Sequence, residues 1–436
     1  MFSYTSGTTG DPKGVKLTHK MIISAGYATN VRVGASGGKP LGEEDSYISY
    51  LPSAHSFEQA VSGMVFVYGL KVGFFGGNVL KLTEDMQILK PTLFPSVPRL
   101  FNKIYGKIQE GIAAKTGAAS WLINKGVNSK LYYLKNGQGV HHKVYDKLVF
   151  NKMKAMLGGD VRLMITGSAP IAGDVLDFLK IAFCSEICEG YGMTETSAAS
   201  VITFCNDPQT GIVGGPLQNV KVKLRDLPDM GHLHTNTPPT GEVCFWGPSI
   251  MSGYFKNPEK TAEAFSPCGW LLSGDVGQIN PNGSIKIVDR AKNIFKLSQG
   301  EYIAPEKLEN VYIKSSWVAQ IWVYGDSLRD HIIAFIVVDP DHTKKWCAAN
   351  DKTFDDALLK SSEFVTMVFD DLMVQARQNK LNSLEKPKQL TLLKDPWSVE
   401  NDYLTPTMKM KRNVAKKLLA DDITRMYSEP LLKEKR

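Results

Sequence analysis

A short loop near the start of the chain, Tyr4–Gly14, combines hydroxyl groups, glycines and one lysine. It reads Tyr-Thr-Ser-Gly-Thr-Thr-Gly-Asp-Pro-Lys-Gly. The glycines let the backbone approach a ligand closely, and the hydroxyls, free N–H groups and Lys13 can surround phosphate oxygens. The loop is not a Walker A motif, because Lys13 is followed by Gly14 rather than by Ser or Thr. Composition alone leaves a flexible, solvent-exposed loop as an equal alternative.

Four further side chains could do chemistry, although each has a simpler interpretation when it is taken alone. Glu195 alone would be a surface carboxylate, and Asp275, within a Ser-Gly-Asp sequence, would be part of a turn. His55 alone would be a structural histidine with its hydrogen bonds satisfied. Lys409, with Lys411 as the second choice, lies in a basic segment that by its charge predicts a helix start facing solvent. The order of the motifs is therefore needed to assign any role.

The bulk composition is that of a folded protein with more than one domain. The chain has 436 residues, of which 43% are hydrophobic and 22% charged, so disorder does not dominate. The net charge of +7 favours anionic ligands or an anionic membrane surface without selecting between them. Six scattered cysteines show no paired zinc-ligand spacing, and reduced thiols fit a cytoplasmic setting.

Periodicity predicts the elements that must position these residues. Val161–Thr166 is an apolar run that suits a buried strand, and the apolar spacing from Ile171 to Phe183 predicts a helix after it. A strand followed by a helix favours an α/β layer. After about Gly241 the pattern changes to short β runs, and Phe354–Asn379 and Asn413–Met426 look helical. The fold class predicted from these elements is α/β.

A polar stretch at Asp289–Lys292 follows one of these strands and suggests a boundary between a large and a small domain. The predicted domains are residues 1–291 and 292–436. The most apolar stretch, Met64–Phe75, is interrupted by glycine and lysine and is too short to span a bilayer. No signal peptide is visible at the N-terminus.

The order of the motifs resembles that of the adenylate-forming superfamily, and Asn293–Glu306 resembles the eukaryotic long-chain acyl-CoA synthetases within it. The resemblance runs from Tyr4 to about Ala415. The motifs that carry it are Tyr4–Gly14, Tyr50–Glu58, Pro95–Phe101, Thr166–Pro170, Gly190–Thr196, Trp270–Asp275, Ile287–Lys292, Asn293–Glu306 and Leu404–Arg412.

The resemblance implies the adenylate-forming fold, in which a large N-terminal domain is followed by a small, mobile α+β domain. It also implies that a region preceding the phosphate loop is missing here, so that the large domain is incomplete. We therefore expect Val65–Leu70 and Gly73–Val79 to lose cover, and the chain to fold poorly or to be weakly active.

The resemblance further implies roles for individual residues in binding the nucleotide. Tyr191 would stack on adenine, Thr194 would touch a phosphate, and Asp275 would accept hydrogen bonds from the ribose hydroxyls. The implied cofactor-binding residues are Thr5, Ser6, Gly7, Thr8, Thr9, Gly10, Lys13, Gly167, Ser168, Ala169, Tyr191, Gly192, Thr194, Asp275, Arg290 and Gly300.

Three residues are implied to be catalytic. Lys409 would stabilise the negative charge of the adenylation transition state, His55 would lie near the acyl carboxylate, and Glu195 would hold Mg²⁺, a hard cation that prefers oxygen ligands. Lys292 would be the hinge between the domains. Gly300 would line the channel for the pantetheine arm of coenzyme A.

The function that the resemblance implies is that of a long-chain fatty acid–CoA ligase. A fatty acid would be adenylated with ATP and then transferred to coenzyme A, giving AMP and pyrophosphate. The substrates would be a fatty acid, ATP and CoA, with Mg²⁺ and without nucleic acid, at a cytoplasmic location peripheral to the endoplasmic reticulum membrane.

Two alternatives to this function stay open. One is a related adenylating enzyme, such as a coumarate ligase or luciferase, against which Gln299–Ile303 argues. The other is a truncated, non-catalytic protein that binds nucleotide.

Overall fold

The computed structural model describes residues 1–5, 12–36, 38–205, 207–291, 293–405 and 408–432, and it divides into two compact units. The first unit contains Met1–Thr5, Lys13–Ser273 and Gly277–Ile287, and the second contains Gly274–Val276 and the described residues from Val288 onward. The predicted domain boundary between residues 291 and 292 stays a prediction.

A seven-stranded sheet forms the centre of the first unit, in the strand order β4-β3-β5-β6-β7-β8-β9. The strands from β4 to β7 are parallel, and β8 and β9 each run antiparallel to the preceding strand in this order. The predicted strand at Val161–Thr166 is found as β6. The strands are β3 (Ser46–Ser49), β4 (Lys71–Phe74), β5 (Leu93–Ser96), β6 (Leu163–Thr166), β7 (Glu186–Tyr191), β8 (Val201–Ile202) and β9 (Gly215–Pro216).

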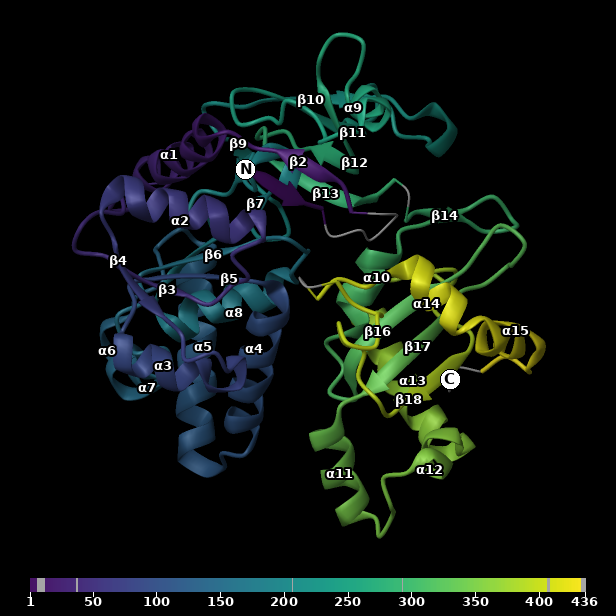
Figure 1. Cartoon of the computed structure of the whole chain (residues 1–436). Helices are drawn as coiled ribbons and strands as arrows, with labels where there is room; N and C mark the ends of the chain where they lie inside the picture. The colour runs from purple at the N-terminus through teal and green to yellow at the C-terminus, as the bar shows by residue number, and fades with distance from the viewer. Residues whose placement is uncertain (6–11, 37, 206, 292, 406–407, 433–436) are drawn as a thin grey trace. The chain divides into compact units, whose positions relative to one another are not determined.

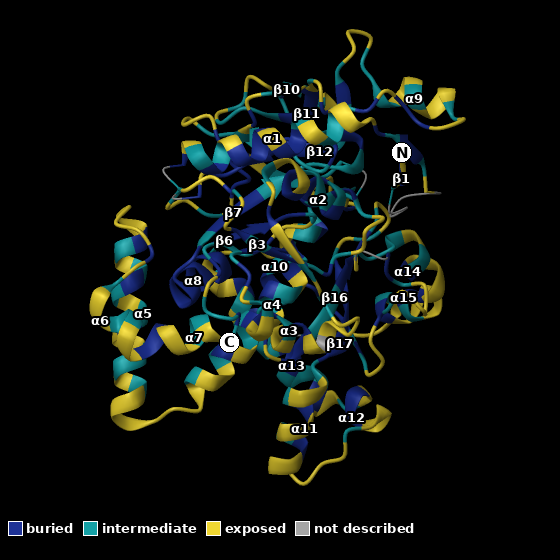
Figure 2. Ribbon diagram, turned by 60° about the vertical axis from the view of Figure 1, so that its left-hand side comes forward, coloured by how far each residue is buried: buried dark blue, intermediate teal, exposed yellow. Residues whose placement is uncertain are grey.

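Helices cover both faces of this sheet, as a mainly parallel sheet requires. Figure 1 shows α1 and α2 on one face and α4, α5 and α8 on the other. One core joins Val61 and Met64 of α2 to Leu163 and Ile165 of β6, and Figure 2 shows that α8 is almost wholly buried. The helices are α1 (His19–Ala35), α2 (Ser56–Tyr68), α3 (Leu82–Leu89), α4 (Pro98–Ala113), α5 (Gly117–Lys135), α6 (Lys143–Tyr145), α7 (Asn151–Ala155) and α8 (Gly173–Phe183).

The chain also forms a second sheet and a short hairpin. The sheet has the order β10-β11-β12-β13, and β1 pairs with β2 in the hairpin. Val15 of the hairpin packs in the same core as Val243 and Phe245 of the sheet, so the hairpin is anchored to it. The elements are β1 (Phe2–Tyr4), β2 (Gly14–Lys16), β10 (Lys221–Arg225), β11 (Thr240–Trp246), α9 (Pro258–Ala264), β12 (Leu271–Ile279) and β13 (Ile285–Arg290).

The second unit is built around the strand β17, all of whose side chains are buried. Alternate residues of β17 enter two cores on opposite faces, Ala334 and Ile336 on one side and Ile333 and Phe335 on the other. β16 pairs with β17 antiparallel, and β18 pairs with it parallel. The elements are β14 (Phe295–Lys296), β15 (Tyr302–Ile303), α10 (Pro305–Tyr312), β16 (Val318–Tyr324), β17 (Ile333–Val338), α11 (Pro340–Ala349), α12 (Asp356–Lys360), α13 (Ser362–Gln378), β18 (Leu390–Leu393), α14 (Arg412–Leu418) and α15 (Ala420–Ser428).

Of the two apolar segments that were expected to lose cover, Val65–Leu70 is exposed in part, and Gly73–Val79 contains no buried residue. Val65 and Leu70 are buried, whereas the side chains of Phe66 and Phe74 are 79% and 81% exposed. Among the residues that the structure describes, no helix is long and apolar enough to cross a membrane.

Glu189, in β7, gives the stability of the first unit a dependence on pH. Its carboxyl is buried, and Oε2 has no hydrogen-bond partner among the described residues. Burial raises the pKa of Glu189 to about 8, although the nearby Lys180 opposes the shift. The folded state therefore keeps a proton that the unfolded state has already released above its ordinary carboxyl pKa, so stability falls as pH rises towards about 8.

We expect Glu189→Gln to remove this dependence. Relative to the variant, the parent chain should lose at most about 1.4 kcal/mol per pH unit between the ordinary carboxyl pKa and the raised one. Thermal unfolding midpoints are measured from about pH 5 to about pH 8, roughly the range between the two pKa values. The midpoints of the parent and of Glu189→Gln should diverge over this range. Glu84→Gln, which changes an exposed carboxyl, should run parallel to the parent. Parallel curves for Glu189→Gln would contradict the assignment.

Candidate active site

The two ends of the predicted phosphate loop, Tyr4–Gly14, are hydrogen-bonded to each other. The backbone N–H of Thr5 donates to the carbonyl of Lys13 at 3.0 Å, and the N–H of Lys13 donates to Thr5 Oγ1 at 3.0 Å. These bonds extend the β1–β2 pairing, in which Tyr4 lies opposite Gly14. Thr5 and Lys13 are thus held at the base of the loop. Five predicted phosphate ligands lie outside the described residues: Ser6, Gly7, Thr8, Thr9 and Gly10.

Lys13 and Glu195 are brought together through a tyrosine that the sequence motifs did not indicate. Lys13 Nζ donates to the Tyr254 hydroxyl at 3.2 Å, and that hydroxyl donates to Glu195 Oε1 at 2.7 Å. The ammonium of Lys13 also lies 4.5 Å from the centroid of the Tyr254 ring. The structure therefore joins the half-buried Lys13 and the predicted metal ligand, Glu195, in one hydrogen-bonded network of the first unit.

The loop that follows β6 lies against the end of β7 at the carboxyl edge of the sheet, where open α/β sheets bind ligands. A Cβ on Gly167 would lie 2.9 Å from the carbonyl oxygen of Gly190, so the loop needs a glycine there. Ser168 has φ +74°, and Ala169 is exposed.

Three predicted nucleotide contacts stand at the end of β7. Tyr191 is its last residue, with its ring 5.8 Å from the ring of Phe245. A Cβ on Gly192 would lie 2.0 Å from the carbonyl oxygen of Ala198, so a larger residue cannot fit without moving the backbone. Thr194 and Glu195 begin a single 3₁₀ turn. The sheet edge thus gathers the predicted adenine and phosphate contacts, whose roles stay predictions.

His55 has a structural contact in the first unit. It is the N-cap of α2, and its Nδ1 accepts a hydrogen bond from the N–H of Phe57 at 3.3 Å. The contact satisfies one of the unpaired donors of the helix N-terminus. The predicted role beside an acyl carboxylate remains a prediction.

Asp275 and Arg290 face each other in the second unit. Arg290 Nε lies 3.5 Å from Asp275 Oδ1, and the N–H of Ala291 donates to the carbonyl of Gly274. Asp275 is buried and Arg290 half-buried. The two predicted ribose contacts are therefore neighbours. Lys292, the predicted hinge, lies outside the described residues.

The backbone of the predicted catalytic lysine is held by two contacts with Thr405. The N–H of Lys409 donates to Thr405 Oγ1 at 3.1 Å, and the N–H of Thr405 donates to the carbonyl of Lys409 at 2.8 Å. Lys411, the second choice, pairs with Asp402 at 2.5 Å. The ion pair gives Lys411 a partner on its own segment.

Arg412, three residues after Lys409, attaches this segment to α10. Its guanidinium makes two hydrogen bonds to the carboxylate of Glu309, at 2.9 and 2.6 Å. Burial alone would lower the pKa of Arg412, but Glu309 raises it above the ordinary value. Burial together with the nearby Glu306 raises the pKa of Asp289 to about 8, and its carboxylate accepts from the N–H groups of Arg290 and Glu306.

Gly300 occupies the turn of the β14–β15 hairpin. Its φ of +97° is a conformation that residues with a Cβ rarely adopt. Its N–H donates to the carbonyl of Leu297 at 2.9 Å, and the residue is exposed. The turn by itself accounts for a glycine, so the predicted place in a pantetheine channel stays a prediction.

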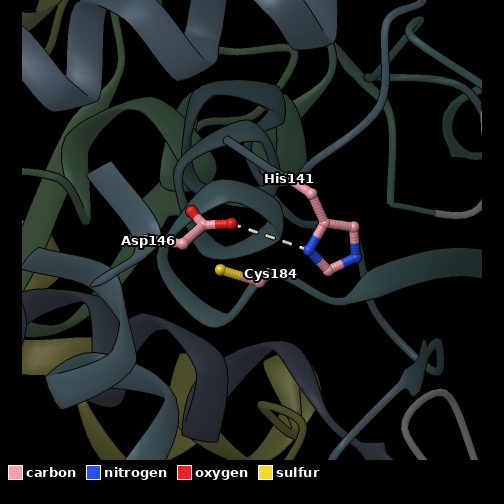
Figure 3. A group of neighbouring side chains, drawn as sticks. All are labelled: His141, Asp146 and Cys184. Atoms are coloured by element: carbon pink, nitrogen blue, oxygen red, sulfur yellow. Dashed lines mark ion pairs between the residues drawn. The ribbon is translucent and has the colours of Figure 1, made fainter. Parts of the chain in front are cut away.

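A separate group of metal-binding side chains lies near α5 and α8. Figure 3 shows His141, Asp146 and Cys184, whose ligand atoms lie within 4.8 Å of one another. The buried Lys130 Nζ lies 2.5 Å from Asp146 Oδ1 and 3.1 Å from Cys184 Sγ. Its ammonium already supplies the positive charge, and its ring contact with Phe150 at 4.2 Å holds it there. The group is an ion-pair cluster, not a metal centre.

Sequence reasoning missed Tyr254 and Arg412 as members of the site. Tyr254 lies in the sequence Met-Ser-Gly-Tyr-Phe, which has no feature that distinguishes it from a core tyrosine. Arg412 was quoted at the end of the lysine motif without a role. Both act through contacts with residues far away in the sequence, which spacing alone does not reveal.

The chain is similar in sequence to known proteins over almost its whole length. The family model described as AMP-binding enzyme matches residues 1–255. The chain is 44% identical over 431 residues to long chain acyl-CoA synthetase 6, peroxisomal, of Arabidopsis thaliana, and 43% identical over 428 residues to long-chain-fatty-acid–CoA ligase 5 of Rattus norvegicus. These alignments cover 98% and 97% of this chain but 60% and 61% of the relatives. The chain thus spans about three fifths of the length of the curated relatives that it matches.

Solved structures show the same fold. The adenylation domain of the carboxylate reductase of Mycobacterium chelonae superposes with a TM-score of 0.79 at 24% identity, covering 98% of this chain and 60% of that one. The corresponding domain from Segniliparus rugosus, a complex with AMP and a co-purified carboxylic acid, gives 0.78 at 25% identity, covering 98% and 61%. The predicted adenylate-forming α/β fold is confirmed, and the chain belongs to the AMP-binding enzyme family.

Proposed function

We propose that this chain carries the chemistry of a long-chain fatty acid–CoA ligase. The observation that carries the proposal is the contact of Lys13 with Glu195 through Tyr254. It joins the phosphate loop to the metal-ligand motif in a chain that is 44% identical to an acyl-CoA synthetase. The reaction would consume a fatty acid, ATP and coenzyme A and would release AMP and pyrophosphate.

In the first half-reaction the fatty carboxylate attacks the α-phosphorus of ATP, and pyrophosphate leaves. Lys13 and the loop hydroxyls hold phosphate oxygens, and Lys409 stabilises the charge that grows on the α-phosphate in the transition state. Glu195 fits Mg²⁺, because its carboxylate is buried and one oxygen is already oriented by Tyr254. The bound cation supplies further neutralisation of phosphate charge. Tyr191 and Asp275 orient the base and the ribose.

In the second half-reaction the thiol of coenzyme A attacks the acyl carbonyl, and AMP leaves. Between the two half-reactions the small domain rotates about Lys292, a hinge movement of a known type. Gly300 then borders the path of the pantetheine arm. His55 lies on the acyl side of the site in this scheme.

We place the protein at the surface of the endoplasmic reticulum membrane as part of this proposal. A long-chain fatty acid partitions into bilayers, and a net charge of +7 favours anionic headgroups. The Arabidopsis relative is named as peroxisomal. Cell fractionation with markers for both membranes decides between the two.

The activity is tested directly with the chain as given. ATP–pyrophosphate exchange and acyl-CoA formation are measured with palmitate and with a panel of shorter and aromatic acids. Preference for palmitate supports the proposal, and preference for an aromatic acid identifies another adenylating ligase. A chain that binds ATP but releases no pyrophosphate with any acid is a binding protein.

Lys409→Ala should separate the two half-reactions. Because the ammonium acts on phosphate charge, pyrophosphate exchange should fall by about 10²–10³-fold, as for the loss of one strong electrostatic contact. Conversion of supplied acyl-AMP and CoA to thioester should change little. Lys411→Ala removes the same charge two positions away and serves as the control. Equal losses in both half-reactions, or a larger effect of Lys411→Ala, would rule out this role for Lys409.

Gly300→Leu should have the complementary effect. The side chain would obstruct the pantetheine path, so thioester formation should fall by roughly 10²-fold while pyrophosphate exchange persists. A side chain also strains the turn, so a second turn glycine is needed for comparison. Gly283 has φ +79°, and its N–H donates to the carbonyl of Asn280 in an equivalent way. Gly283→Leu should destabilise the fold similarly and spare both half-reactions. If Gly300→Leu makes acyl-CoA normally, Gly300 is only a turn residue.

A further inference from the structure

Tyr254 separates a cation from a carboxylate that would otherwise be free to pair. The phenol oxygen lies 3.2 Å from Lys13 Nζ and 2.7 Å from Glu195 Oε1. An ammonium has only donors and a carboxylate only acceptors, whereas a phenol can accept from the first and donate to the second. The geometry thus fixes the direction of the proton in this chain of contacts.

The phenol keeps its proton in this position. Tyr254 is 5% exposed, and burial together with the charge of Glu195 raises its pKa far above the ordinary value. The hydroxyl donates to Glu195 Oε1 at 2.7 Å. The bond occupies Oε1 and fixes the plane of the carboxylate, which leaves Oε2 outside this interaction.

The backbone around Tyr254 is tied to both partners. The N–H of Met251 donates to the carbonyl of Glu195 at 2.8 Å, and the N–H of Phe255 donates to the carbonyl of Gly14 at 2.7 Å. The N–H of Tyr254 donates to Thr261 Oγ1 at 2.9 Å, which anchors it to α9. The segment from Met251 to Phe255 is consequently a strap between the phosphate loop and the Glu195 turn.

We propose that Tyr254 is a positioning residue that orients Glu195 for a divalent cation and keeps Lys13 from pairing with that carboxylate. The inference rests on the proposed function only in taking Mg²⁺ and ATP as the ligands of this site. Without the hydroxyl, the ammonium and the carboxylate would face each other in a buried environment, where opposite charges attract strongly. Lys13 would then compete with the cation for Glu195.

The test is the Mg²⁺ dependence of ATP binding, which is measured by calorimetry with the full chain. The fatty acid is left out, so that no reaction takes place. Tyr254→Phe keeps the ring and removes the hydroxyl. The Mg²⁺ concentration for half-maximal enhancement of ATP binding should rise by about 10-fold, as for the loss of a hydrogen bond to a charged group. ATP binding without Mg²⁺ should change much less.

Tyr47→Phe is the matched control. Tyr47 is also buried and also donates its hydroxyl to a buried glutamate, Glu58, in the same unit, and it contacts neither Lys13 nor Glu195 through this hydroxyl. It should lower the unfolding temperature comparably and leave the Mg²⁺ dependence unchanged.

A double variant gives a second, independent readout. In Tyr254→Phe/Lys13→Gln no ammonium competes for Glu195, so the half-maximal Mg²⁺ concentration should return towards that of Lys13→Gln alone. The cycle of four proteins isolates the interaction between the two positions.

The outcomes distinguish this inference from the proposed function. An unchanged Mg²⁺ dependence in Tyr254→Phe, or an equal change in Tyr47→Phe, overturns the inference. ATP binding by the parent chain that ignores Mg²⁺ overturns it as well. A response to Tyr254→Phe in a chain that adenylates no acid upholds the positioning role and refutes the ligase activity.

Discussion

A buried carboxylate must be paired, and the pairing of Glu195 organises the first unit. Its hydrogen bond from Tyr254 satisfies one oxygen without neutralising the charge, so the site keeps a negative group beside the base of a phosphate loop. A direct ion pair with Lys13 would have cancelled both charges and left neither for a ligand. The strap that carries Tyr254 depends in turn on the β1–β2 hairpin and on the core around Phe245. Packing remote from any ligand thus determines how the site can bind one.

In the second unit, by contrast, a carboxylate is paired directly with a cation. Arg412 and Glu309 pair directly in a bidentate contact, which neutralises both groups and fixes the start of α14 against α10. The segment that carries Lys409 precedes this contact, so the C-terminal end of that segment is attached to α10. Removing one partner of such a pair leaves an uncompensated buried charge, which is more harmful than replacing both. The structural ion pair of Arg412 and the lysine with the predicted catalytic role, Lys409, therefore stand three residues apart.

The sequence predicted elements well where periodicity was clear and boundaries poorly where caps intervene. The buried strand and the helix that follows it were found as β6 and α8, because their apolar residues follow one period. The single helix predicted at Phe354–Asn379 is two helices, since Ser361 takes an extended conformation and caps α13 through the N–H of Phe364. The helix predicted at Asn413–Met426 is likewise divided, at Leu419. Tyr254 could not be found in this way, because its role depends on contacts with residues 59 and 241 positions away.

The motif glycines show how far a pattern of residue types can support an assignment. Gly167 and Gly192 are required by the chain itself, because a Cβ on Gly167 would collide with the carbonyl of Gly190 in β7, and a Cβ on Gly192 would collide with the carbonyl of Ala198 in its own loop. Their presence in the motifs therefore follows from how tightly the chain packs at the sheet edge, before any ligand is considered. A Cβ on Gly300 would make only an ordinary contact, 3.8 Å from Lys296 Cε, so its positive φ explains the residue type. Close packing and a positive φ are thus separate reasons for the same residue type, and only a structure distinguishes them.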